Sequence, residues 1–132
     1  MSLIRSVDAT DLGASTVTLI SAAETVVLVG PRLQTPKDTS FILSFAFFTM
    51  TVGASTTAIV ARIRSGATVA GAQIGSGGTE AVVSGGANYA GNAWGFQQVQ
   101  ATDYVQNCLT VQQTAGTANG TVTGATLIMA SW

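Results

Sequence analysis

The feature that most constrains this chain is a period-two alternation of side chains, repeated in short segments that turn residues separate. In the longest segment, Ser40–Thr51, both alternating sets are largely apolar. One set is Phe41, Leu43, Phe45 and Phe47, and the other is Ile42, Ser44, Ala46, Phe48 and Met50. Alternation of this kind is typical of β-strands, and no segment keeps the helical period of about 3.6 residues for more than two turns. The sequence therefore predicts an all-β fold with essentially no helix.

Clusters of Gly, Ala, Ser and Thr interrupt the alternation about every ten residues, as expected for an antiparallel sandwich or barrel. The expected strands are Thr16–Ile20, Thr25–Val29, Ser40–Thr51, Thr57–Arg64, Ala67–Ile74, Thr79–Ser84, Ala93–Ala101, Tyr104–Thr114 and Val122–Ser131. About eight to ten strands are enough for two packed sheets. With 132 residues, the chain is long enough for one domain. We expect residues 1–13 to form an N-terminal arm and residues 14–132 a single antiparallel β-sandwich.

The composition excludes several classes of function. Charged residues make up 8% of the chain, and the net charge is -1, which does not suit nucleic acid or an anionic membrane surface as a partner. Histidine is absent, so a Ser-His-Asp triad and a His-ligated zinc site are excluded. No two carboxylates are placed by the pattern across a cleft. The sequence therefore predicts no enzyme activity, no cofactor and no metal site.

The cysteine content and the N-terminus bear on the compartment. Cys108 is the only cysteine, so no disulfide can form within the chain, and we expect it to pack as an inert apolar residue. No secretory signal is visible, which predicts synthesis in a cytoplasm. The apolar run Phe41–Phe48 is too short for a membrane helix, and no membrane is expected as a partner.

The order of several short motifs carries a resemblance to a known group. Thr16-Val-Thr-Leu19 and Glu24-Thr-Val-Val-Leu28 precede a loop with Pro36, the Phe-rich strand Phe41–Phe48 and Arg62-Ile63-Arg64. Tyr104-Val105, the Asn119-Gly120 hairpin and Ala125–Met129 follow. In this order, residues 14–132 resemble the small jelly-roll proteins of tumour-necrosis-factor-like topology that recur as capsid decoration proteins, fibre heads and spikes of bacteriophages and viruses.

This resemblance implies a homotrimer with a structural role. We expect a capsid decoration or cement protein that binds capsid proteins on the surface of a virion, after synthesis in the host cytoplasm. The alternative is a carbohydrate-binding or receptor-binding head of a phage fibre or spike. The two interpretations place the contacts of the chain on different residues.

Two groups of residues are candidates for contacts between proteins. Phe48, Met50, Tyr104 and Trp132 exceed what one small sandwich interior needs, and the strand faces around them lack charge, which suits a subunit interface. Arg62 and Arg64 lie on the same side of one strand and could bind an anionic group across the threefold axis or on a capsid. The equal alternative for these two arginines is a solvated strand face.

A cluster of aromatic and amide side chains is the candidate sugar site. Asn88, Tyr89, Asn92, Trp94 and Gln97 lie within ten residues of one another. An aromatic face beside amide groups suits stacking on a sugar ring and hydrogen bonding to its hydroxyls. The competing interpretation is that Trp94 and its neighbour Phe96 pack into the core or a subunit contact, while the asparagines form turns.

Overall fold

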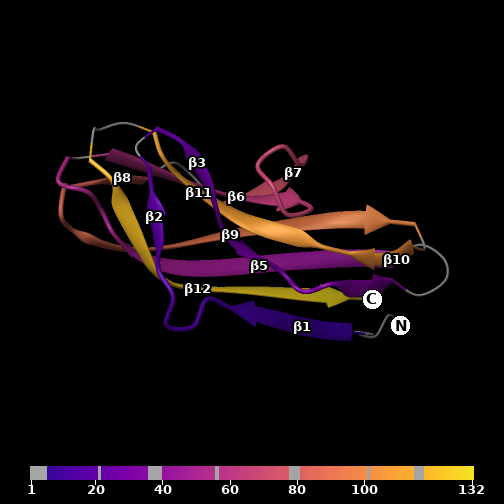
Figure 1. The fold of residues 1–132 in the computed structure, drawn as a ribbon. Helices are drawn as coiled ribbons and strands as arrows, with labels where there is room; N and C mark the ends of the chain where they lie inside the picture. The colour runs from indigo at the N-terminus through magenta and orange to yellow at the C-terminus, as the bar shows by residue number, and fades with distance from the viewer. Residues whose placement is uncertain are drawn as a thin grey trace.

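A computed structural model describes residues 6–20, 22–35, 40–55, 57–77, 81–100, 102–114 and 118–132 of the chain. These residues contain twelve strands and no helix (Figure 1). The strands are β1 (Ser6–Asp11), β2 (Val17–Leu19), β3 (Glu24–Val29), β4 (Leu33–Thr35), β5 (Ser40–Thr51), β6 (Thr57–Ser65), β7 (Gln73–Ser76), β8 (Ala81–Val83), β9 (Asn88–Val99), β10 (Thr102–Val105), β11 (Asn107–Gln113) and β12 (Gly120–Ser131). Among the described residues, no helix is long and apolar enough to span a membrane.

The strands form two layers, as the sequence predicted. Their hydrogen-bonded order is β1-β12-β5-β9-β7-β6-β11-β3, and every pairing is antiparallel. This ladder folds over near β7, so that β1, β12, β5 and β9 form one layer and β6, β11 and β3 the other (Figure 1). The strands β2 and β8 add to β12 and β6, and β4 pairs with β10 in a small separate sheet. The fold is an antiparallel jelly-roll sandwich.

The core lies between the layers and fixes which side of each strand is outside. Its largest fully buried apolar side chains are Leu19, Leu33, Ile42, Met50, Ile63, Leu109, Leu127 and Met129. On β5 the even-numbered residues point inward from Ile42 to Met50, because successive side chains of a strand face opposite sides. The odd-numbered residues of β5 therefore point away from the core.

Four expected elements differ from the structure. Ser6–Asp11, expected within an N-terminal arm, is the edge strand β1, and all six of its residues are in register with β12. Most of the expected strand Ala67–Ile74 is a loop that follows Gly66, whose φ of 84° is left-handed, and only β7 is extended. The strand β9 begins at Asn88, five residues before its expected start.

The expected long strand Tyr104–Thr114 is two strands that meet at Gln106. β10 pairs with β4, whereas β11 lies between β6 and β3. Gln106 lies between these two pairings, and its Nε2 donates to the backbone oxygen of Gly30 at 3.0 Å. The chain therefore changes sheets at a point where its alternation continues, which is why the pattern alone did not reveal the break.

Candidate functional site

The outward side of the β1-β12-β5-β9 layer carries a continuous apolar surface. The registers align its side chains in rows, with Phe45 between Trp94 on β9 and Ile128 on β12, and Leu43 between Phe96 and Ala130. We call this surface the aromatic face. It consists of Val7, Ala9, Phe41, Leu43, Phe45, Phe47, Trp94, Phe96, Ile128, Ala130 and Trp132.

The rings of the aromatic face are exposed, but they also pack against one another. The exposed fractions are 38% for Phe45, 47% for Phe47, 53% for Trp94 and 47% for Phe96. Phe41 and Phe96 stack with centroids 5.6 Å apart, and Trp132 lies 5.6 Å from Phe96. Because these rings already restrict one another, a partner that covers them has less side-chain entropy to remove.

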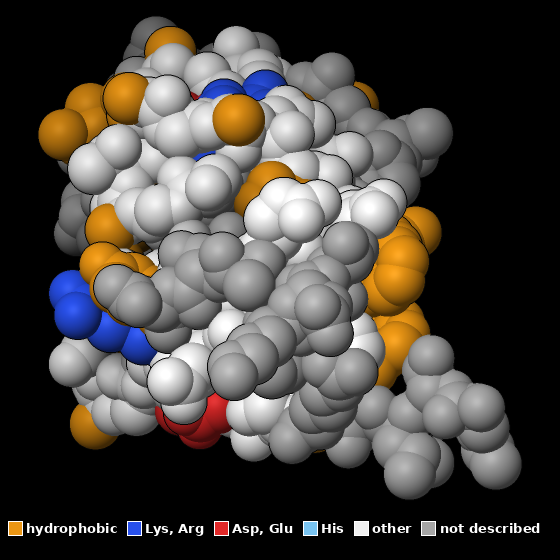
Figure 2. Space-filling view, turned by 90° about the vertical axis from the view of Figure 1, so that its right-hand side faces the viewer, with side chains coloured by type: hydrophobic (Ala, Val, Ile, Leu, Met, Phe, Trp, Pro, Cys, Tyr) orange, Lys and Arg blue, Asp and Glu red, His pale blue; other side chains and the backbone are white. Residues whose placement is uncertain are grey.

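The exposed area of this surface reaches that of a functional apolar patch. At about 200 to 250 Å² per side chain, the rings of Phe45, Phe47, Trp94 and Phe96 together leave about 400 Å² open. The largest apolar patch of a typical monomer is about 300 to 600 Å² and is often functional, and here the aliphatic residues add to the rings. Figure 2 shows hydrophobic side chains gathered along one side of the end that carries β10, away from the Lys and Arg side chains.

The border of the aromatic face is polar. Among the described outward side chains of these four strands, the only charged one is Asp11, whose Oδ2 accepts from Thr126 Oγ1 at 3.2 Å. Beyond Phe47 the same side of the sheet carries Thr49, which bonds Thr123, and Thr51, which bonds Asn88. A charge-free centre with a polar border is the arrangement found in protein interfaces.

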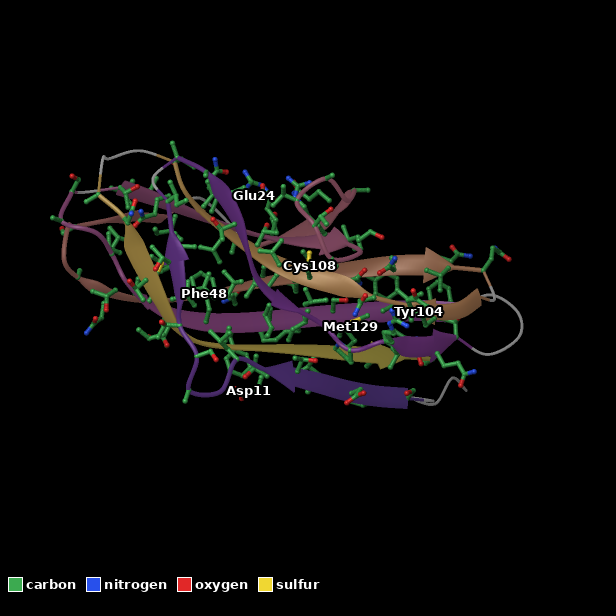
Figure 3. The ribbon with its side chains drawn as sticks, in the orientation of Figure 1. Asp11, Glu24, Phe48, Tyr104, Cys108 and Met129 are labelled. Atoms are coloured by element: carbon green, nitrogen blue, oxygen red, sulfur yellow. The ribbon has the colours of Figure 1, made fainter. Side chains whose placement is uncertain are left out.

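The structure separates the four residues expected at a subunit interface. Phe48 and Met50 are 2% and 1% exposed and pack in the core, so the prediction that these two lie at an interface is wrong. Phe48 is labelled in Figure 3, where it lies beside β5. Both sides of β5 are apolar, and the second layer covers the even-numbered side. Trp132 is half-buried at the edge of the aromatic face. Tyr104 is exposed on β10, in the small separate sheet, with the Arg32 guanidinium 4.4 Å from its ring centroid.

Arg62 and Arg64 point outward on β6, where they hold one carboxylate. Glu24 Oε1 lies 2.8 Å from Arg62 Nη1 and 2.9 Å from Arg64 Nη2, and Glu24 Oε2 bonds Arg64 Nε. Arg62 also donates to Gln112 at 3.0 Å, and Arg64 to the backbone oxygen of Gly71 at 3.0 Å. The hydrogen bond and charge of Arg64, together with the charge of Arg62, hold the pKa of Glu24 below its ordinary value. The two arginines form an intramolecular ion-pair cluster, in which Glu24 neutralises one of their two positive charges.

The candidate sugar residues are split between the two sides of β9. Asn88, Asn92 and Trp94 point outward and are exposed, with Trp94 inside the aromatic face. Tyr89 points to the other side and packs on Phe48, with centroids 6.0 Å apart. The expected combination of Tyr89 with the two asparagines is therefore not formed.

Reactive groups are few in the described part of the chain. Cys108 is fully buried, its thiol lies 3.9 Å from the backbone oxygen of Thr68, and burial raises its pKa. No group of three or more His, Cys, Asp or Glu residues that could hold a metal occurs among the described residues. The candidate functional site is therefore the aromatic face, a surface suited to contact with another protein.

Sequence reasoning identified the alternation of β5 but missed most of the aromatic face. Phe45, Phe47 and Val7 were not singled out, and Phe96 was named only as the neighbour of Trp94. The available signal was that a strand with two apolar sides needs a cover on each. This signal does not show which of the two sides is covered by the chain itself and which is left for a partner.

Solved structures with the same fold include chains of viral particles and a TNF from an insect. A chain of the infectious bursal disease virus VP2 subviral particle matches with a TM-score of 0.56 and 8% identity, over 96% of this chain and 33% of the viral one. Eiger TNF from S. frugiperda matches with a TM-score of 0.52 and 10% identity, over 97% of this chain and 94% of that one. The chain shares its antiparallel jelly-roll fold with both of these proteins. The predicted resemblance is confirmed for the fold.

The similarity to these structures covers only part of the viral chains and is not accompanied by sequence relatives. The chain spans about a third of the length of the viral chains that it matches. No protein-family model matches the sequence, and no curated protein matches it. At sequence identities of 6–10%, these similarities show a shared fold and nothing about function.

Proposed function

We propose that this chain is a structural protein of a virus particle, a decoration or cement protein that forms a homotrimer and binds capsid proteins. The observation that carries the proposal is the aromatic face. A small domain that leaves about 400 Å² of ring surface open would associate through it. The chain supplies no cover of its own among the described residues, and a second copy offers the same charge-free surface.

Two further points support a structural role at the virion surface. The fold is shared with chains of viral particles. Among the described residues, nothing resembles a catalytic set, and the proposal includes neither enzyme activity nor a cofactor. The number of subunits rests on the resemblance to the tumour-necrosis-factor-like jelly rolls and is part of the proposal.

The alternative, a fibre or spike head that binds a carbohydrate through Asn88, Tyr89, Asn92 and Trp94, has weaker support. Tyr89 faces the core side of β9, away from the two asparagines. Trp94 has Asn92 and Ser76 as neighbours, but it is also part of the aromatic face, with Phe45 and Phe96 beside it. Trp94 therefore fits a contact between proteins better than a sugar platform.

Analysis of purified virus particles tests the proposed role. Particles from the source of this sequence are separated on a density gradient, and their proteins are quantified by peptide mass spectrometry. We expect peptides of this chain in the particle fraction, in a number of copies that is a multiple of three. Recovery of the chain only in the soluble fraction would contradict the proposal.

A further inference from the structure

A second feature lies where the two layers separate beside β10. It is an open groove of about 450 Å³, between the ends of β6 and β9 and the start of β11. Its walls include Ser65, Gln97, Val99, Tyr104, Val105 and Gln106. All described side chains that line it are uncharged. Its volume is in the range of about 300 to 1,000 Å³ that is usual for small-molecule sites.

A buried asparagine orients the amide of Gln97 in this groove. Asn107 is fully buried, and its Nδ2 donates to Ser44 Oγ at 2.8 Å and to Gln97 Oε1 at 2.7 Å. The reverse orientation of the Asn107 amide would bury two N–H groups without acceptors, which costs more than the single oxygen, Oδ1, that has no partner among the described residues. Since Oε1 of Gln97 is bound on the inner side, its Nε2 is the donor left for the groove.

The neighbouring polar groups add a hydrogen-bond acceptor and a hydroxyl to the donor of Gln97. Gln106 Nε2 donates to the backbone oxygen of Gly30, so its Oε1 is left as an acceptor. The hydroxyl of Ser65 can both donate and accept. The groove therefore presents a donor, an acceptor and a hydroxyl whose positions are set by the strands that carry them.

Besides Gly66 and Gln100, the remaining walls are apolar and include one aromatic ring. Val99 and Val105 line the groove together with Tyr104. The guanidinium of Arg32 lies over the Tyr104 ring, which restricts its rotation. The sequence predicts an aromatic ring beside amide groups as a sugar site around Trp94, and the structure places a ring beside two amides in this groove.

We propose that this groove binds a neutral saccharide unit. The vicinal hydroxyls of a pyranose both donate and accept, which matches Gln97 Nε2, Gln106 Oε1 and Ser65 Oγ, and its C–H face suits the Tyr104 ring and the two valines. An ionic ligand would find no opposite charge among the described lining side chains. This binding function goes beyond the proposed structural role and does not depend on the trimer.

The test is an NMR titration of the full chain with the methyl glycosides of glucose, galactose, mannose and N-acetylglucosamine. We expect saturable shifts of the backbone amides of Ser65, Gly66, Gln97 and Gln106 with at least one of them. The variant Gln97→Glu keeps an acceptor for Asn107 but replaces the groove donor with a carboxylate, so affinity should fall at least about tenfold, the loss of one good hydrogen bond. Gln98→Glu makes the same change on the opposite side of β9 and should leave affinity unchanged.

A second variant covers the case in which Gln97→Glu fails to fold. Tyr104→Ala removes an exposed ring and should weaken the same shifts. The proposal is contradicted by the absence of saturable shifts with all four glycosides, by equal affinity in the folded variants, or by shifts confined to Asn88, Asn92 and Trp94. The assembly mass of the same samples is measured separately, so glycoside binding by a monomer would refute the trimer alone, and a trimer without binding would refute this site alone.

Discussion

Replacement of Trp94 by serine should separate the subunits while leaving each one folded. Trp94 points outward from β9, on one side of the aromatic face, and lies opposite Phe45. Its backbone keeps its strand pairing in the variant, and its side chain contributes little to the core because it is 53% exposed. The change therefore acts mainly on surface that a second copy would cover.

The size of the effect follows from the exposed area. Half of a tryptophan surface of about 250 Å² is roughly 130 Å². At about 25 cal/mol per Å², burial of this area stabilises each subunit contact by about 3 kcal/mol. Because about 1.4 kcal/mol corresponds to a factor of ten, Trp94→Ser should weaken association roughly a hundredfold for each contact.

Sedimentation equilibrium over a range of concentrations measures this change. The matched control is Val82→Ser, which removes a 76% exposed apolar side chain from β8, a strand that pairs with β6. We expect the control to retain the assembly of the unmodified chain. Trp94→Ser should have a much higher dissociation constant, so that it is monomeric at concentrations where the control is assembled. Equal dissociation constants for the two variants would refute the argument from the aromatic face.

Three further predictions concern the fold itself. The pKa of Glu24 is lowered from its ordinary value of 4.5, so the ionised carboxylate stabilises the folded chain above that pH, and this stabilisation is lost as the pH falls through the lowered value. In thermal unfolding, the difference in stability between the unmodified chain and Glu24→Gln should therefore shrink below pH 4.5. A difference that stays constant with pH would contradict this. A Cβ on Gly75 would lie 1.9 Å from the backbone oxygen of Trp94, so Gly75→Ala should lower the free energy of unfolding by about 2 kcal/mol or more in denaturant titration, whereas Ser76→Ala should not. Buried Cys108, with its raised pKa, should resist iodoacetamide at neutral pH until the chain unfolds, and rapid alkylation of the folded protein would show that its burial is wrong.

The strands with strong alternation could be predicted from the sequence. The bounds of Ser40–Thr51 are those of β5, and β6 and β12 begin or end within two residues of the expected positions. Such strands carry enough apolar residues for local pattern to decide the conformation. Residues 67–72 also alternate, but there the left-handed Gly66 and the contact of Gly71 with Arg64 form a loop instead.

The candidate sites depended on contacts that a pattern does not encode. Whether Phe48 or Phe47 faces solvent is decided by which side the second layer covers. Glu24 meets Arg64 across β11, 40 residues away in sequence. Gln97 is oriented by Asn107, which is itself bonded to Ser44 63 positions away. Each of these arrangements arises only when strands distant in sequence become neighbours.

The mass of the unmodified chain in solution shows directly whether three copies associate. Native mass spectrometry of the purified protein at micromolar concentration reports the number of subunits without labels or substitutions. We expect a species of three times the 13.3 kDa chain mass. A stable, soluble monomer of 13.3 kDa would contradict it, because the aromatic face would then remain open to water without a partner copy.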